Sequence, residues 1–229
     1  MTTEAVIFDW GGTLTPWHTI DHVALWQEIC RPHFPGDHDR QAAAAHAAEM
    51  KAWDLVISDR RSSTLLAVLE QAGIEPTEGL LASYREQWAP HTFTDPAAAA
   101  VLGYLRMRNI KTGLLSNTLW PRDWHDDIFR RDGVLSLLDG AVYSSEIAWA
   151  KPHREAFVAA MTAVGVADPS RCVFVGDRPW DDIHGAQSLG MRAVLVPHSE
   201  VPAFDGTLPD AVISDLSELP ALIESWAAR

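Results

Sequence analysis

The sequence is poor in positive charge. Among 229 residues, 18 lysines and arginines stand against 31 aspartates and glutamates, which gives a formal net charge of −13. Nucleic acids and anionic membranes bind basic surfaces, so we expect neither as a partner. The only lysines are Lys51, Lys111 and Lys151. An anionic substrate must therefore be attracted by local charge, and a lysine close to a candidate site becomes significant.

Cysteines and long apolar runs are also scarce. The spacing of the two cysteines, Cys30 and Cys172, matches neither a disulfide framework nor a metal site. No stretch approaches the roughly 20 apolar residues of a membrane span, and the N-terminus lacks a basic region followed by an apolar segment. We therefore expect a cytoplasmic protein with one large domain or a core plus an insertion, as a monomer or homodimer.

A buried strand that ends in a carboxylate opens the chain. The apolar run 5–8 predicts the strand, Asp9 follows it, and Gly11 and Gly12 allow a sharp turn. Open α/β sheets place their chemistry at the C-terminal end of such a strand. The alternative interpretation is an ordinary glycine-rich turn with a solvated aspartate.

The remaining chain divides into a helical part and an alternating part. Residues 17–90 contain no convincing strand, and helices are predicted over 22–30, 39–57, 62–72 and 78–88. Strands are predicted afterwards over 111–115, 140–144, 171–175, 191–196 and 211–213, with helices between them and at the end. This pattern predicts an α/β core, with a mostly parallel sheet covered on both faces, from residues 1–16 and 91–229. Residues 17–90 would form an all-helical insertion.

Polar residues follow several predicted strands. The C-terminal ends of parallel strands share one edge of the sheet, so Asp9, Ser116 and Asn117 should meet there. Lys151 follows another strand after a short loop. Asp9 is a candidate nucleophile, Ser116 and Asn117 offer a hydroxyl and an amide to phosphate oxygens, and Lys151 offers a neutralising charge. The alternative for Lys151 is a solvated surface lysine.

Two further carboxylates belong to the same predicted edge. Asp177 follows a strand, and Asp182 lies five residues later. Together with Asp9 they form an oxygen-rich set that suits Mg²⁺. The alternative is a solvated acidic loop in which Asp182 caps the next helix.

Four stretches together resemble one family. They are FDWGGTL at 8–14, LLSN at 114–117, AKP at 150–152 and VGDRPWDD at 175–182. In this order they resemble the haloacid dehalogenase superfamily of hydrolases, which implies a Rossmann-like core with a helical cap at 17–90. The implied activity is Mg²⁺-dependent hydrolysis of a small phosphorylated metabolite through an aspartyl-phosphate.

The resemblance also implies a role for individual residues. Asp9 and Lys151 would be catalytic. Phosphate would be bound by Gly12, Ser116, Asn117 and Lys151. The metal ligands would be Asp9, the backbone carbonyl of Gly11, Asp177 and Asp182.

The first motif departs from the pattern of family phosphatases at Gly11. Those enzymes resemble this chain but carry a second aspartate there, which acts as general acid and base. Such help is typically worth ~10²–10⁴-fold in rate. We therefore expect weakened catalysis, biased toward substrates whose leaving group needs no proton.

The departure at Gly11 leaves three functional hypotheses. The first is a phosphohydrolase with a substitute acid or base from the cap, with His18, Asp21 and His22 as candidates. The second is a phosphonate hydrolase, since family members with Asp-Trp in this motif resemble the chain and use a cap lysine, here Lys51. The third is a catalytically silent protein that binds a phosphorylated ligand. Carbon–halogen cleavage is less favoured, because family dehalogenases carry a bulky aromatic residue at the second position.

Tryptophan is frequent, with ten residues. Trp10, Trp120, Trp149 and Trp180 lie near the four motifs, where they would either line an apolar pocket or pack between cap and core.

Overall fold

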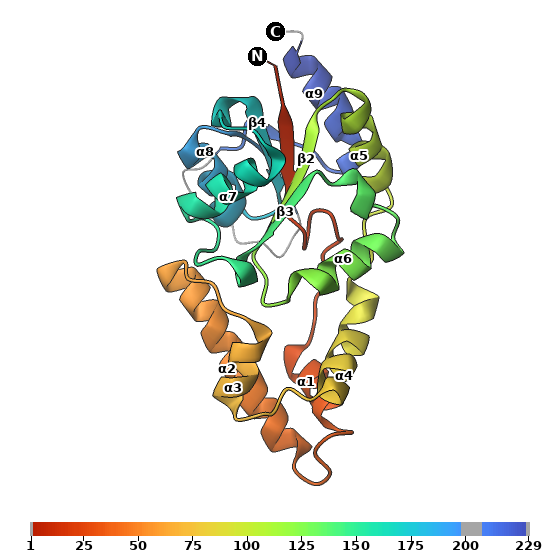
Figure 1. Ribbon diagram of the computed structural model, residues 1–229, viewed down its shortest axis with the longest axis vertical. Helices are drawn as coiled ribbons and strands as arrows, with labels where there is room; N and C mark the ends of the chain where they lie inside the picture. Colours follow the sequence, from red (N-terminus) through yellow and green to blue (C-terminus); the bar gives the residue numbers. More distant parts are fainter. Residues whose placement is uncertain (1, 198–207, 228–229) are drawn as a thin grey trace.

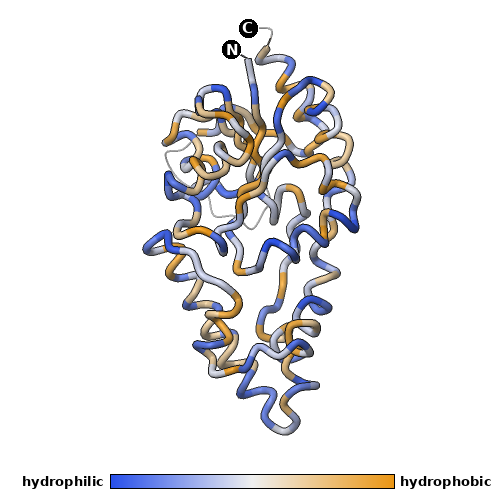
Figure 2. The backbone as a smooth tube through the Cα atoms, viewed as in Figure 1, coloured by the Kyte–Doolittle hydropathy of each residue, from blue (hydrophilic) through white to orange (hydrophobic). Residues whose placement is uncertain are grey.

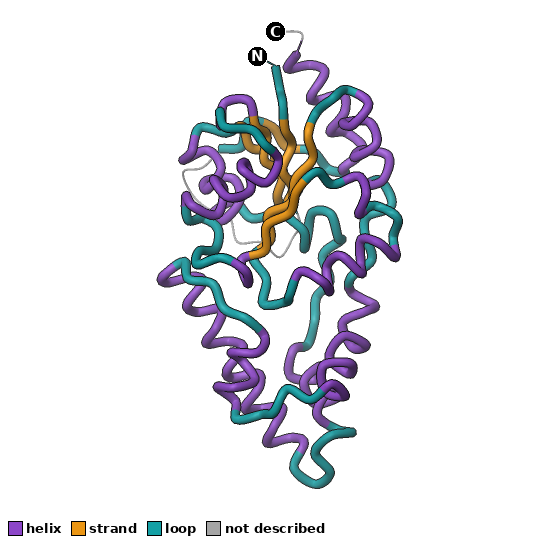
Figure 3. The backbone as a smooth tube through the Cα atoms, viewed as in Figure 1, coloured by secondary structure: helices purple, strands orange, loops and turns teal. Residues whose placement is uncertain are grey.

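A six-stranded parallel sheet forms the centre of the molecule (Figures 1 and 3). The computed structural model describes residues 2–197 and 208–227. The strands are β1 (Ala5–Phe8), β2 (Lys111–Ser116), β3 (Gly140–Tyr143), β4 (Cys172–Gly176), β5 (Arg192–Leu195) and β6 (Ala211–Val212), in the order β3-β2-β1-β4-β5-β6. The chain therefore builds the sheet outward from β1 in one direction and then returns to the other side of β1. Such a reversal of strand order is where open α/β sheets form their sites.

Helices cover both faces of this sheet, as predicted. Alternate residues of β1 point to opposite faces. Val6 and Phe8 pack with α5 (Ala98–Met107) and α9 (Leu219–Ala227), and Ala5 and Ile7 with α7 (Arg154–Val164) and α8 (Gly185–Leu189). Apolar residues accordingly concentrate along the strands (Figure 2). The α/β fold class is confirmed.

Four helices lie at the C-terminal edge of the sheet and are here called the cap (Figure 1). They are α1 (His22–Cys30), α2 (His38–Asp59), α3 (Leu65–Ala72) and α4 (Glu78–Trp88). The side chains of Asp21, Thr64 and Thr77 accept the backbone N–H three residues later and so begin α1, α3 and α4. The cap has its own apolar cluster, but Leu119 and Trp120 of the core complete it. The division at residues 17–90 stays a prediction.

Helix α6 (Arg122–Arg131) lies between the sheet and helix α4 of the cap (Figure 1). His125 and Phe129 occupy its buried face, and the ring of Trp120 just before it meets Tyr84 and Trp88 of α4. The indole N–H of Trp120 donates to the hydroxyl of Tyr84 at 3.0 Å. Cap and core are thus packed together along this side. None of the described helices is long and apolar enough to cross a membrane.

The described chain also contains six short helical turns that the sequence pattern does not predict. They are 3₁₀ turns at Ala89–His91, Leu135–Leu137, Ser144–Glu146, Pro169–Arg171 and Leu216–Glu218, and a π-helical turn at Pro179–His184. The predicted start of α2 is also wrong, because the helix begins before Asp39. The helix begins at His38 with Asp37 before it, so Asp39 lies in the first turn and not at the cap.

Two glycines give a test of the packing between α7 and the sheet. In Gly140→Ala the added Cβ would lie 2.4 Å from the carbonyl oxygen of Ala163, a backbone atom that cannot move away alone. We expect a loss of about 1–3 kcal/mol in the free energy of unfolding. At Gly103 of α5, no described atom outside its own helix backbone and its chain neighbours lies within 4 Å of an added Cβ. Gly103→Ala should therefore stabilise the chain by about 0.5–1 kcal/mol, and urea unfolding of both variants checks the contrast.

Candidate active site

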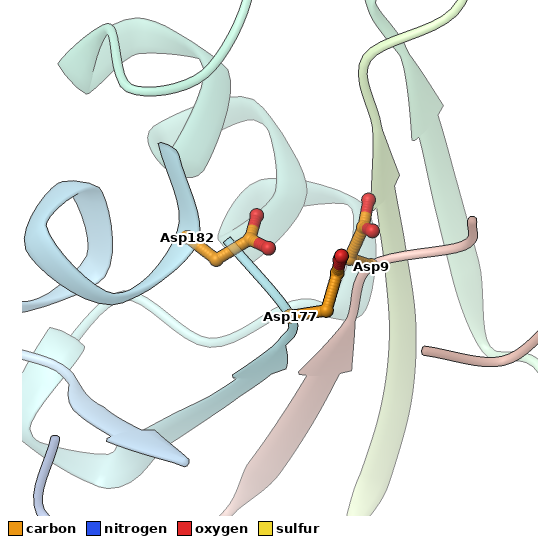
Figure 4. A group of neighbouring side chains, drawn as sticks. All are labelled: Asp9, Asp177 and Asp182. Atoms are coloured by element: carbon orange, nitrogen blue, oxygen red, sulfur yellow. The ribbon is translucent and has the colours of Figure 1, made fainter. Parts of the chain in front are cut away.

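Three carboxylates converge at the point where the strand order reverses (Figure 4). Asp9 follows β1, Asp177 follows β4, and Asp182 lies in the π-helical turn. Oxygen atoms of the three lie within 4.8 Å of one another, and all three residues are buried. The backbone N–H of Asp9 donates to the carbonyl of Val175 at 2.9 Å, which fixes the end of β1 against β4. The predicted meeting of these residues is therefore observed.

Lys151 lies between two of these carboxylates. Its Nζ donates to Asp9 Oδ1 at 2.5 Å and to Asp182 Oδ1 at 2.7 Å, and the residue is only 2% exposed. Burial alone would lower the pKa of Lys151, but the charges of Asp182 and Asp9 outweigh it and raise the pKa above its usual value. The lysine is thus a fixed buried cation, and the surface alternative is wrong.

The π-helical turn places Asp182 beneath the end of β4. An added Cβ at Gly176 would lie 2.4 Å from the Asp182 carboxyl carbon, so only glycine permits this approach. The second oxygen of Asp182 accepts the backbone N–H of Arg178 at 2.9 Å. Asp182 is fully buried inside the turn, which excludes the alternative of a solvated helix cap. Burial raises the pKa of Asp182 against the opposing effect of Lys151.

Asp177 is a buried carboxyl group close to two others. Burial and the nearby carboxylates of Asp9 and Asp182 raise its pKa well above the usual range. Arg178 Nε lies 3.4 Å from Asp177 Oδ2 and only partly offsets this effect. Crowded carboxylate oxygens of this kind suit a hard divalent cation, which would relieve the repulsion.

The two glycines of the first motif differ in their surroundings. Gly12 has a φ of +88°, and an added Cβ would lie 2.6 Å from Asp177 Oδ2, so a side chain there would displace the carboxylate. Its N–H donates to the carbonyl of Thr15 at 2.7 Å. Gly11 lacks the left-handed conformation, and no atom of the described residues other than its two chain neighbours lies within 4 Å of an added Cβ. The place of the expected acid/base is therefore open space.

Ser116 and Asn117 occupy the end of β2 and the loop after it. Ser116 is buried at 2% exposure. The side-chain amide of Asn117 accepts the backbone N–H of Lys151 at 2.8 Å and donates to its carbonyl at 3.0 Å. Asn117 thus orients the loop that carries Lys151, a role the sequence did not suggest. Phosphate binding by Ser116, Asn117 and Gly12 stays a prediction.

The candidate cap residues are held by local contacts. Asp21 begins α1, and His18 lies against His91 with ring centroids 5.3 Å apart. His22 Nδ1 lies 3.3 Å from the buried carboxylate of Glu49, and this hydrogen bond raises the pKa of His22. Lys51 is exposed on α2 and makes no hydrogen bond or ion pair to a site residue in the described ranges.

The tryptophans near the motifs pack mainly against other rings. Trp10 contacts Trp120 at 5.3 Å and the buried His125 at 4.5 Å between ring centroids. Trp149 and Trp180 stack on His153 and His184 at 3.9 and 4.2 Å. For Trp10 and Trp120 the interpretation of packing between cap and core is the one observed.

His125 is a buried residue of this region that the sequence did not reveal. Its Nε2 lies 3.1 Å from Thr118 Oγ1, and burial lowers its pKa to about 3, so it is neutral near pH 7. It therefore supports the loop after β2 as an uncharged ring. The spacing of four between His125 and Phe129 is the signal that could have identified this buried face.

Replacement of the buried lysine tests the charge balance. Lys151→Met would leave Asp9 and Asp182 buried without their cation, so we expect about 3–5 kcal/mol of destabilisation. Lys51→Met removes an exposed charge of the same type and should change stability by less than about 0.5 kcal/mol. Urea unfolding in the presence of EDTA measures both. Equal stability of the two variants would contradict the proposed charge balance.

Known proteins are similar to this chain in sequence and in fold. A family model described as haloacid dehalogenase-like hydrolase matches residues 3–190. Phosphoserine phosphatase from Thermus thermophilus is 30% identical over 208 residues, which cover 89% of this chain and 76% of that protein. The solved 2-haloacid dehalogenase from Pseudomonas syringae has a TM-score of 0.70 at 25% identity and covers 98% of this chain and 100% of its own. A haloacid dehalogenase-type phosphatase from Thermococcus onnurineus has a TM-score of 0.69 at 22% identity, with 96% and 98% covered. The chain therefore belongs to the haloacid dehalogenase-like hydrolase family.

Proposed function

We propose that this protein is a Mg²⁺-dependent phosphohydrolase that acts on a small phosphorylated molecule through Asp9. The observation that carries the proposal is the position of the Lys151 ammonium between Asp9 and Asp182, beside Asp177. This set combines a nucleophile, a fixed positive charge and a group of oxygen ligands. The similarity to phosphoserine phosphatase from Thermus thermophilus supports phosphate as the transferred group.

Asp9 is the group that attacks the substrate. One carboxylate oxygen accepts from Lys151, and attack by the carboxylate on phosphorus would form an acyl-phosphate and release the leaving group. Water would then hydrolyse the acyl-phosphate and regenerate the carboxylate. Lys151 holds Asp9 in place and opposes the negative charge that accumulates on the phosphoryl oxygens.

The metal would lie among Asp9, Asp177 and the carbonyl of Gly11, with Asp182 as direct or outer support. The fit rests on the convergence of oxygen atoms from Asp9, Asp177 and Asp182 within 4.8 Å of one another, since crowded carboxylates bind a divalent cation more readily than they share the site without one. Bound Mg²⁺ would supply charge neutralisation and orientation of the phosphoryl oxygens. Asp182 keeps both oxygens paired, with Lys151 and with the N–H of Arg178, so its main role is to position the lysine.

The substrate class follows from Gly11. Among the described residues, and apart from its two chain neighbours, Gly11 has no atom within 4 Å of the point where a Cβ would lie, so no described side chain takes the place of the expected aspartate directly at this point. Release of a poor leaving group needs a proton, whereas a phenolate or carboxylate departs without one. We therefore favour activated esters or mixed phosphate anhydrides over simple alkyl phosphates.

Substitution of the nucleophile tests the proposal. Asp9→Asn removes the attacking carboxylate, so Mg²⁺-dependent release of p-nitrophenol from p-nitrophenyl phosphate should be abolished. Asp168→Asn alters an exposed aspartate that precedes β4, at the opposite end of that strand, and should keep the wild-type rate. Failure of the wild-type protein to hydrolyse any ester in a broad panel would leave the silent ligand-binding hypothesis in its place.

Restoration of the missing carboxylate tests the account of Gly11. Gly11→Asp fits the open space without backbone strain and should raise turnover of alkyl phosphates by about 10²–10⁴-fold. Gly11→Asn has the same shape but cannot transfer a proton, so it should leave the rate near that of the wild type. Equal rates for the two variants would show that the carboxylate is not what the site lacks.

A further inference from the structure

A second contact between cap and core lies on the side away from α4 and α6. The cap segment Arg60–Leu65 meets the core loop Ile147–Ala150, and this pair of segments is here called the clasp. The N–H of Ala150 donates to the carbonyl of Arg60 at 2.9 Å, and the N–H of Ser62 donates to that of Ala148 at 3.4 Å. The hydroxyl of Ser62 also donates to the carbonyl of Ile147. The two segments therefore pair like a short antiparallel bridge.

Side chains reinforce this pairing. The guanidinium of Arg61 lies 4.9 Å from the centroid of the Trp149 ring, a cation–π contact. Trp149 in turn stacks on His153, with centroids 3.9 Å apart and planes 5° from parallel. His153 begins α7, since its ring accepts the N–H of Glu155 at 3.2 Å. The cap is thus connected through Arg61 and Trp149 to a rigid helix of the core.

The core segment of the clasp continues directly into Lys151. Ala150, bonded to the cap, precedes the lysine whose Nζ lies between Asp9 and Asp182. The backbone of Lys151 is also held by Asn117. Two residues after Asn117, the carbonyl of Leu119 accepts the N–H of Leu65 at 2.7 Å. The same cap segment therefore contacts both loops that hold Lys151.

The clasp is placed where it must open when the cap moves. Both connections between cap and core, at residues 15–21 and 89–95, lie nearer to α4 than to the upper end of α2 (Figure 1). A rotation about these connections would separate Arg60–Leu65 from Ile147–Ala150. The hydrogen bonds next to Lys151 would be lost in the same motion.

We propose that Arg61 and Trp149 are positioning residues that couple closure of the cap to the placement of Lys151. The closed cap fixes the segment before the lysine, and an open cap releases it. The link to turnover rests on the proposed function, whereas the link to the Lys151 loop does not.

Arg61→Ala in the full chain tests the clasp itself. Loss of a cation–π contact at an exposed site corresponds to a factor of about two to five. Amide hydrogen exchange in the peptide that contains Ala150 should accelerate by that factor. Arg154→Ala removes the same charge from an exposed side chain of α7 with no hydrogen bond, ion pair or ring contact among the described residues, and should match the wild type. Equal exchange in the two variants would overturn the clasp.

Acetylation by acetic anhydride tests the coupling to Lys151 without any substrate. Mass spectrometry can compare Lys151 with the exposed Lys51 and Lys111 in each variant. We expect Arg61→Ala to accelerate acetylation of Lys151 alone by about two- to five-fold. Trp149→Phe, which keeps a ring for the guanidinium, should label more slowly than Trp149→Ala. Faster exchange at Ala150 with unchanged labelling of Lys151 would overturn the coupling.

Kinetics with p-nitrophenyl phosphate and Mg²⁺ add a functional readout. Because the proposal assigns the clasp to the placement of Lys151 and not to the binding of substrate, Arg61→Ala should lower kcat by the same factor and change KM less. A fall in activity that appears only in KM would contradict the placement role. If the wild-type protein shows no turnover, the proposed function fails, and exchange and acetylation still decide the clasp.

Discussion

The ion pairs of Lys151 with Asp9 and Asp182 are the interaction on which the site depends. Three carboxylates buried within a few ångströms of one another repel strongly, and each loses hydration. The lysine provides the cation that makes this arrangement compatible with a folded chain. Its own burial is tolerable only because both partners are charged. In the proposed function the same charge would also face the phosphoryl group of the substrate. One ammonium group would then serve both the stability of the fold and the proposed chemistry at Asp9.

The sheet and the turns that follow its strands fix the positions of the three carboxylates and of Lys151. Asp9 and Asp177 follow adjacent parallel strands, so their separation is set by the spacing of β1 and β4. The position of Asp182 is set by a less regular element, the π-helical turn that packs against Gly176. Asn117 fixes the backbone of Lys151 from the neighbouring loop. The cap adds its own constraint on that loop from the other side.

Much of this architecture could be predicted from the sequence, because hydrophobic patterns and strand ends are local features. The order of strands and helices, the helical insertion and the meeting of Asp9, Lys151 and Asp177 all follow from such patterns. Contacts that depend on rotamers and on the paths of loops could not be predicted. Three such contacts are the hydrogen bonds of the Asn117 amide to Lys151, the ring contact of His125 with Trp10, and the cation–π contact of Arg61 with Trp149. The π-helical turn at Pro179–His184 could not be predicted either, because its two adjacent aspartates look the same in sequence whether they lie in a loop or in such a turn.

The open space beside Gly11 has a consequence for how such a site can change. Gly11 has an ordinary backbone conformation, and within the described part of the chain a Cβ there would have no neighbour within 4 Å beyond the two adjacent residues. Codons for glycine and aspartate can differ by one base, so a single mutation would place a carboxylate there without any compensating change elsewhere. No barrier of packing or strain separates the present sequence from one with a carboxylate at position 11. The packing of the fold therefore does not require glycine at position 11. If glycine is selected there, we expect the selection to act on the ligand that the site binds.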